Sequence, residues 1–405
     1  MTSHLETRIA ERVAALRADL VALRRDFHMH PELSHAERRT GQVIAERLTA
    51  LGLRVRSGVG GHGVVADLEG ALPGPLLAYR ADMDALPMQD MLDTAYRSQN
   101  PGVKHACGHD AHMTIALGVA EVLVDLRETW PGTVRFIFQP AEESLDGARQ
   151  MLAAGVLDPP PEAILGLHMF PIPVGQVGLA DEVCLVGMEE FRVRLYSPAG
   201  HLDTLMTKAA SALRALSTAR APTGPTTFAA LVQSMQTSDA HQDTVLVSCW
   251  PRYPEAAMRG EHLLGLVSIP RAVLRQQVRA QIHRVLNEVT AEMGAAYDLT
   301  YTFDNPPTKN DAGLVREFLP IAQDVVGAAN VLRFRAPYPF AHEDFALYQQ
   351  HAPGLLLWLG SANPKRGLTA LLHAPDFDVD EDALTIGTRL MATALLRVAR
   401  ARSAA

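Results

Sequence analysis

The chain has 405 residues, of which 48% are hydrophobic and 20% are charged, and its formal net charge is −8. This composition is typical of folded globular proteins, and the length allows two domains or one large core with an insertion. Because there is neither a basic block nor an apolar run of about 18 residues, the sequence argues against nucleic acid and membrane as partners.

The first residues carry charges and no continuous apolar run, so we expect no secretory signal. The three cysteines, Cys107, Cys184 and Cys249, are too few and too scattered for a disulfide framework. We therefore expect a reducing, cytoplasmic setting, in which a cysteine thiolate remains available as a metal ligand.

The first part of the chain alternates between helical and strand patterns. Apolar residues recur at three- and four-residue steps from Ile9 to Phe27, which predicts an amphipathic helix, and a second helix is expected from about Glu37 to Leu51. Strands are then predicted at 64–68, 76–80, 134–139 and 163–168, with helices at 114–126 and 147–154. This alternation predicts an α/β domain built on a mixed, largely buried sheet.

The pattern changes near Gly187. Strands are predicted at 191–196, 227–233, 244–250, 263–269 and 299–303, and helices at 206–219 and 272–293. Two helices against one antiparallel sheet predict an inserted α+β domain of the ferredoxin-like type at residues 188–304. Because a strand at 355–359 and a helix at 382–399 resume the α/β pattern, we expect 1–187 and 305–405 to form one discontinuous catalytic domain.

Residues 105–112 read His-Ala-Cys-Gly-His-Asp-Ala-His. Three histidines, a cysteine and an aspartate within one short segment are the donors that a divalent transition metal binds. Taken alone, the segment fits a polar loop as well. From an extended loop, Cys107 and His109 can both face one metal, whereas helical geometry would splay them apart.

Two adjacent carboxylates, Glu142 and Glu143, follow the predicted strand 134–139. Such a pair is costly unless a positive charge lies beside it. One carboxylate can bind a metal while its neighbour carries a proton, as metal-assisted hydrolysis requires, although a solvated pair is the plainer alternative. His168 ends another predicted strand and His373 lies near the C-terminus. Most of these candidates follow predicted strands, where sites in α/β sheets collect.

Five segments, taken together and in order, resemble the signatures of the M20 family of metallopeptidases and amidohydrolases. They are Arg80 to Pro87, Cys107 to Asp110, Gln139 to Glu143, Gly166 to His168, and His373 to Phe377. More narrowly, they resemble the amidohydrolase branch, which includes hippurate hydrolases, N-acyl-amino-acid deacylases and auxin-conjugate hydrolases. The segments Phe27 to Leu33 and Glu343 to Phe345 match further positions of the family.

The resemblance implies a metal-dependent hydrolase of C–N bonds. It implies that one or two divalent metal ions are bound per subunit, with Mn²⁺ expected first and Zn²⁺, Co²⁺ or Ni²⁺ as alternatives. The implied ligands are Cys107, His109, Glu143, His168 and His373, with Cys107 in the place of a bridging carboxylate.

The resemblance also implies roles around the metal. Glu142 would be the general acid/base, and Asp84 would orient a histidine or the thiolate region from behind. Asp110 and His112 would support the site without binding metal. His201, in Gly200-His201, would stabilise the oxyanion, and the inserted domain would act as a lid and join subunits in a homodimer or larger homo-oligomer.

The inserted domain departs from the family pattern. After His201 the family continues with small residues and a proline, but this chain has Leu202 to Met206. The usual Asn-Val-Ile-Pro stretch is missing between Ser238 and Arg271, and His342 stands where the family has a small residue. We therefore expect an altered small-molecule substrate, with Met206, Arg271 and His342 lining its pocket.

Three functions remain open from the sequence. The first is an amidohydrolase that cleaves an N-acyl amino acid or an aromatic amide. The second is a hydrolytic deaminase that releases ammonia from an electron-poor aromatic amine, such as a substituted aminobenzoate. The third, a non-catalytic relative, is disfavoured because Glu142 and the whole set of implied ligands are present, and a buried charged cluster without metal is costly.

Overall fold

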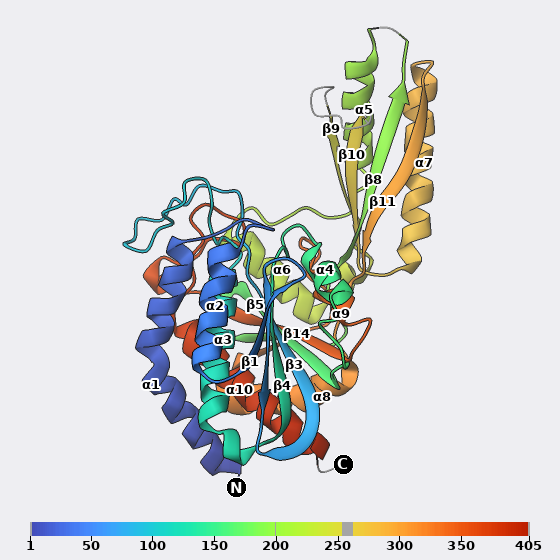
Figure 1. Cartoon of the computed structure of the whole chain (residues 1–405). Helices are drawn as coiled ribbons and strands as arrows, with labels where there is room; N and C mark the ends of the chain where they lie inside the picture. Colours follow the sequence, from blue (N-terminus) through green and yellow to red (C-terminus); the bar gives the residue numbers. More distant parts are fainter. Residues whose placement is uncertain (1, 199, 253–261, 404–405) are drawn as a thin grey trace.

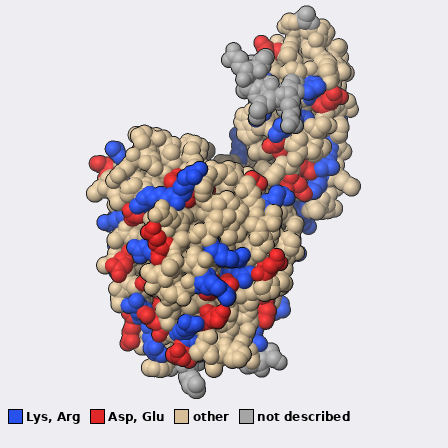
Figure 2. Space-filling model, in the orientation of Figure 1, with Lys and Arg blue, Asp and Glu red and all other residues tan. Residues whose placement is uncertain are grey.

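The computed structural model describes residues 2–198, 200–252 and 262–403. The chain forms a large unit and a smaller unit that extends away from it (Figure 1). Acidic and basic side chains are interspersed over both units on the face shown in Figure 2. Within the described part of the chain, no helix combines the length and the apolar character that crossing a membrane requires.

The large unit is built on an eight-stranded sheet with the order β1-β2-β4-β3-β5-β14-β6-β13. Its strands are β1 (Arg54–Val59), β2 (Gly63–Glu69), β3 (Leu72–Asp82), β4 (Pro131–Gln139), β5 (Ala163–Pro173), β6 (Val177–Ala180), β13 (Val331–Phe334) and β14 (Gly354–Ala362). β3 runs parallel to β4 and β5, and β14 runs parallel to β5, whereas β1 and β2 pair antiparallel. The carboxyl ends of four adjacent strands therefore lie at one edge of the sheet.

Helices cover both faces of this sheet (Figure 1). One face packs against α1 (Thr2–Met29), α2 (Arg38–Ala50), α3 (His109–Asp125), α8 (Ala312–Val326) and α10 (Asp382–Ser403). The other packs against α4 (Gly147–Ala153), α6 (Pro225–Thr237) and α9 (Phe345–Tyr348). Side chains of β3 alternate between the two cores, with Leu77 and Tyr79 in the first and Ala78 in the second, as a strand buried on both faces requires.

The smaller unit is a four-stranded antiparallel sheet with the order β11-β8-β10-β9. Its elements are β8 (Gly187–Tyr196), α5 (Leu202–Arg214), β9 (Leu246–Pro251), β10 (Leu263–Ile269), α7 (Val273–Glu292) and β11 (Ala296–Asn305). Leu205 of α5 and Ile282 of α7 share a core with Phe191 and Val193 of β8, so both helices lie on one face. The predicted α/β class with a separate small antiparallel sheet is confirmed.

The remaining elements are short. They are the paired strands β7 (Val183–Leu185) and β12 (Thr308–Lys309), and the 3₁₀ turns Arg127–Thr129, Ala240–Asp243, Ala328–Asn330 and Pro364–Arg366.

The strand predicted at 227–233 is wrong, because these residues belong to α6. Pro225 starts the helix, and Phe228, Val232 and Met235 follow at helical spacing and bury in the core of the large unit. The predicted boundaries 188–304 assign this segment to the inserted domain, yet its apolar face packs on the large sheet.

Candidate metal centre

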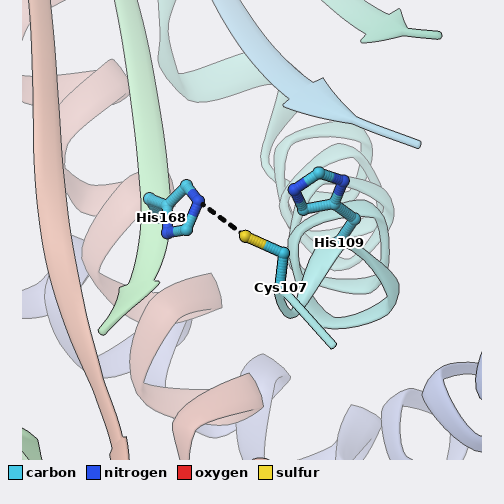
Figure 3. Close-up of side chains that lie close together, drawn as sticks. All are labelled: Cys107, His109 and His168. Atoms are coloured by element: carbon cyan, nitrogen blue, oxygen red, sulfur yellow. Dashed lines mark hydrogen bonds between the residues drawn. The ribbon is translucent and has the colours of Figure 1, made fainter. Parts of the chain in front are cut away.

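Three buried side chains converge from the start of α3 and from β5. Cys107 lies just before α3, His109 is its first residue, and His168 lies in β5 (Figure 3). The Cys107 Sγ atom is 3.4 Å from Nε2 of His168. Between the first two, Gly108 has a φ of 88°, and this left-handed turn joins the loop to the helix. Cys107, in the loop, and His109, the first residue of the helix, therefore reach the same cluster, so the start of the helix does not splay them apart.

The hydrogen bonds of the two histidines leave one ring nitrogen of each facing the cluster. Nδ1 of His109 donates to the backbone oxygen of Asp84 at 2.9 Å, and Nδ1 of His168 donates to the backbone oxygen of Met169 at 2.6 Å. Because Nδ1 carries the proton in each ring, Nε2 keeps a lone pair that can bind a metal. Among the described residues, the buried Nε2 of His109 has no hydrogen-bond partner.

Cys107 also belongs to a second group with Glu143 and His373. Nε2 of His373 is 3.3 Å from Cys107 Sγ and 3.5 Å from Oε1 of Glu143. In each group, the candidate ligand atoms lie within 4.8 Å of one another. The two groups share the cysteine, so together their donors would be able to hold two cations.

The electrostatics of the cluster favour a cation. Burial alone would lower the pKa of His109, but the carboxylates of Asp82, Asp84 and Glu143 raise it to about 10. Burial, followed by the charges of Glu143 and Glu142, raises the pKa of the Cys107 thiol far above its ordinary value. A divalent cation can take the place of these protons, since it deprotonates a thiol that it binds. This mixed set of sulfur, nitrogen and oxygen donors fits a divalent transition metal.

Asp84 holds the turn that carries Glu142 and Glu143. Its Oδ1 accepts the backbone N–H of Glu142 at 3.1 Å, and its Oδ2 accepts that of Glu143 at 3.0 Å and the hydroxyl of Ser34 at 2.6 Å. Burial, followed by the charges of Glu343 and Glu143, raises the pKa of Glu142 well above its ordinary value. Glu142 is therefore a carboxyl group suited to hold and release a proton.

Two further residues of the 105–112 segment face other partners. Nδ1 of His112 donates to Asp82 at 2.6 Å, and its Nε2 accepts the backbone N–H of Met169 at 2.7 Å, so both ring nitrogens are occupied. Asp110 forms a buried ion pair with Arg24 at 2.9 Å. Both arrangements support the start of α3.

A buried ion cluster next to Glu142 was not predicted from the sequence. The Arg80 guanidinium lies 2.5 Å from Asp82, 2.9 Å from Glu343 and 3.1 Å from Asp344. The available signal was the charged pair Arg80 and Asp82 at the end of a buried strand, because such charges need partners. The partners are 263 and 264 residues away from Arg80 in the sequence, so only folding identifies them.

A cavity of about 420 Å³ opens onto this cluster. Cys107, Glu142, Glu143, His168 and His373 supply its polar side. Most of its remaining lining is apolar and aromatic, and includes Leu185, Tyr338, Phe340, Trp358, Leu371 and Leu372. No lysine or arginine lines it in the part of the chain that the structure describes.

Residues 78–397 match Peptidase family M20/M25/M40. The chain belongs to this family. It is 32% identical over 388 residues to the N-acetylcysteine deacetylase of Bacillus subtilis, covering 93% of this chain and 96% of the relative. It is 31% identical over 387 residues to IAA-amino acid hydrolase ILR1-like 5 of Arabidopsis thaliana, covering 93% and 86%.

A solved structure leads to the same family. The YXEP protein of Bacillus subtilis, described as a dinuclear metal-binding M20 peptidase, superposes with a TM-score of 0.74 at 30% identity and covers 96% of this chain and 99% of its own. The predicted family is thus confirmed. The chain is an M20 metal-dependent hydrolase acting on C–N bonds.

Of the residues predicted to contact substrate in this M20 enzyme, His342 lines the cavity. Its Nε2 lies 2.8 Å from the hydroxyl of Ser268 in β10, which links the two units, and burial lowers its pKa to about 4. Met206 instead packs in the core of the smaller unit with 1% of its surface exposed. Arg271 is paired with Asp243 and does not line the cavity.

His201 is not brought to the cluster either. It is the exposed N-cap residue of α5, and α5 begins at the end of the smaller unit farthest from the large sheet (Figure 1). Within one chain, in this arrangement, His201 therefore does not touch the cavity.

Proposed function

We propose that this M20 hydrolase cleaves the amide bond of an N-acyl amino acid or of an aromatic amide. The observation that carries the proposal is one cavity in which a donor cluster, a protonatable Glu142 and aromatic walls meet. The printed functions of two relatives, an N-acetylcysteine deacetylase and an IAA-amino acid hydrolase, point to the same class of bond.

In this proposal, Cys107, His109 and His168 hold one divalent cation, and Cys107, Glu143 and His373 hold a second, with Mn²⁺ as the first choice. Support comes from the free nitrogen of His109 and from Oε1 of Glu143, which is buried and has no hydrogen-bond partner among the described residues. When bound, a divalent cation supplies Lewis acidity, which lowers the pKa of water and polarises a carbonyl oxygen.

The side chains of the protein then move the protons. Glu142 takes a proton from the attacking water and returns it to the leaving nitrogen, which a raised pKa favours. Asp84 fixes the positions of Glu142 and Glu143 relative to each other, because its carboxylate accepts a hydrogen bond from the backbone N–H group of each. The apolar walls hold the acyl group and exclude water from it.

A second candidate is the hydrolytic deaminase of an electron-poor aromatic amine. It is favoured by the flat aromatic side chains of the cavity wall, Tyr338, Phe340 and Trp358, against which an aromatic ring can stack. Arg271, which we expected to line the substrate pocket, is engaged with Asp243 and does not line the cavity, so it supplies no charge to an anionic ring there.

A panel of N-acetyl and N-benzoyl amino acids and of substituted aminobenzoates separates the two candidates. With Mn²⁺-loaded protein, we expect free amino acid from the acyl compounds and no ammonia from the aminobenzoates. Ammonia from an aminobenzoate, with the acyl compounds untouched, would replace the first candidate by the second. If no C–N bond in the panel is hydrolysed with any of the four metals, both are contradicted.

The role of Glu142 is tested by Glu142→Gln, with Glu143→Gln as the matched comparison. We expect Glu142→Gln to bind metal in the wild-type amount and to lose about 10²- to 10⁴-fold in kcat, because it lacks the proton carrier. Glu143→Gln should lose metal, since it removes a proposed ligand. Metal content by elemental analysis and kcat for both variants give the answer, and near-normal turnover by Glu142→Gln would contradict the mechanism.

A further inference from the structure

Residues 219–244, here called the strap, leave the smaller unit and return to it. The two ends of the strap are joined there, because the backbone N–H of Thr218 donates to the oxygen of Val245 at 2.8 Å, and the Thr218 hydroxyl accepts the N–H of Val245 at 2.9 Å. Between these ends, α6 lies on the large unit (Figure 1). The strap is therefore a connection between the two units in addition to β8 and β11.

Three apolar side chains anchor α6 in the large unit. Phe228, Val232 and Met235 are 4%, 7% and 0% exposed and share the core that contains residues of β5 and β14. The ring of Phe228 packs edge-on against Phe170 of β5, with centroids 5.1 Å apart. α6 is therefore anchored on the large sheet by side chains that are part of its close-packed core.

The strap also holds one wall of the active-site cavity. The backbone oxygen of Met235 accepts the N–H of Arg335 at 2.9 Å and that of Ala336 at 3.3 Å. These residues begin the segment 335–342, which carries Tyr338, Phe340 and His342 into the cavity lining. The position of these three side chains thus depends on α6.

The strap contributes residues of its own to the cavity. Ala221 and Pro222, in the stretch that leads into α6, line it together with the segment 335–342. The strap, whose two ends lie in the smaller unit, therefore fixes the position of two parts of the cavity wall: its own residues Ala221 and Pro222, and the segment 335–342.

We propose that the strap determines which substrates this enzyme accepts, by limiting the size of the uncharged ring or acyl group that enters beside Ala221 and Pro222. The inference rests on the proposed function, because it takes the cavity to be the site of the substrate, but it holds for amide and aryl amine alike. The small side chain of Ala221 leaves room that a larger residue would fill, while the donor cluster is untouched.

The test compares Ala221→Leu with Ala230→Leu, the same substitution on the exposed side of α6. Binding of acetohydroxamic, benzohydroxamic and 2-naphthohydroxamic acid to the Mn²⁺-loaded protein is measured by isothermal titration calorimetry. We expect Ala221→Leu to weaken binding of the naphthyl compound about tenfold relative to binding of the acetyl compound, since overfilling a packed site costs about that much binding free energy. Ala230→Leu should leave the ratio of the two Kd values within about twofold of wild type.

A second pair of variants tests the anchor. Phe228→Ala removes the anchor of α6, so it should strengthen binding of the naphthyl compound relative to the acetyl compound, the opposite of the effect of Ala221→Leu. If thermal unfolding shows that Phe228→Ala does not fold, Pro222→Gly takes its place. Three outcomes would overturn the strap inference. They are an equal change in Kd for all three ligands, the same ratio of Kd values for Ala221→Leu and Ala230→Leu, and no binding of the ligands to the wild type. Size-dependent binding without hydrolysis of the panel would overturn the proposed reaction and leave the strap inference supported.

Discussion

Glu37, the N-cap residue of α2, is a fully buried carboxyl group that touches the turn before Glu142. Its Oε1 accepts the backbone N–H of Ala141 at 2.8 Å and that of His35 at 3.1 Å. Both of these residues have positive φ values, 55° for Ala141 and 67° for His35, so the carboxyl group stabilises backbone that is otherwise disfavoured. Burial raises the pKa of Glu37 from 4.5 to about 7.

We predict that Glu37→Gln stabilises the protein at pH 8 more than at pH 5. A raised pKa means that the unfolded chain loses the proton first as the pH rises from 4.5, so the contribution of Glu37 to stability is fully present below 4.5 and is lost through about 7. Glutamine keeps an acceptor oxygen and does not ionise. The difference in unfolding free energy between variant and wild type should therefore grow by the order of 2 kcal/mol from pH 5 to pH 8.

Urea unfolding at the two pH values measures this difference. The control is Glu46→Gln on the same helix, where the side chain is exposed, and for which we expect no change with pH. If the difference for Glu37→Gln is also constant with pH, Glu37 is ionised in the folded protein and the prediction fails.

At the scale of elements, the start of α3 against β5 brings Cys107 and His109 to His168. Gly108 permits this contact for two reasons. Its φ of 88° is unfavourable for residues with a Cβ atom, and a Cβ there would lie 2.9 Å from the Cβ of the buried Met169. The helix can approach the strand this closely only with glycine at its N-cap.

We predict that Gly108→Ala destabilises the protein by about 2–4 kcal/mol and lowers its affinity for metal, because left-handed strain adds to a clash in a packed core. Gly102→Ala is the matched control, since Gly102 has a φ of 75° but a Cβ there would have no neighbour within 4 Å. It should show the strain alone, about 1 kcal/mol, with normal metal binding. Unfolding curves and metal titrations of both variants measure these losses. Equal losses of stability and of metal affinity in the two variants would mean that the contact with Met169 does not matter.

At the scale of the whole molecule, the two units place His201 and the cavity apart. α5, which His201 caps, begins at the far end of the smaller unit (Figure 1), whereas the residues that line the cavity belong to the large unit and to the strap. A histidine that stabilises an oxyanion must touch the reacting group. If His201 has this role, it acts after movement of the smaller unit or from a second copy of the chain.

We predict that His201→Ala lowers kcat by about 10²- to 10³-fold, and that the histidine comes from a second copy. Refolding Glu142→Gln together with His201→Ala should then restore about a quarter of wild-type activity, since half of the dimers are mixed and each mixed dimer has one complete site. Activity no higher than that of the two variants alone would show that each chain supplies its own His201 or that the residue has no such role.

Most of the large unit follows from local pattern. The apolar spacing from Ile9 to Phe27 predicts α1, and the strands and helices of the α/β alternation appear near their expected positions, although α3 begins at His109 and not at 114. α8 was not predicted, and Pro320 within it disguises the helical pattern. The five proposed metal ligands, which follow from motif order, do come together in the structure.

The errors arise where tertiary contacts outweigh local preference. Residues 225–228 read Pro-Thr-Thr-Phe, and threonine and phenylalanine favour strands, yet burial of Phe228, Val232 and Met235 on the large unit makes the segment helical. Met206 was expected in the substrate pocket, but its spacing along α5 directs it into the core of the smaller unit.

The sequence by itself determined the family, the fold class and the five proposed ligands that the fold brings together, because spacing and motif order are local properties of a chain. Only the tertiary structure decided the partners of Arg80, the sharing of Cys107 between two donor groups, and the return of the strap to the large unit. These features depend on contacts between segments that lie far apart in sequence. Burial and charge pairing select the partners there, and the spacing of residues along the chain does not indicate which partners they are.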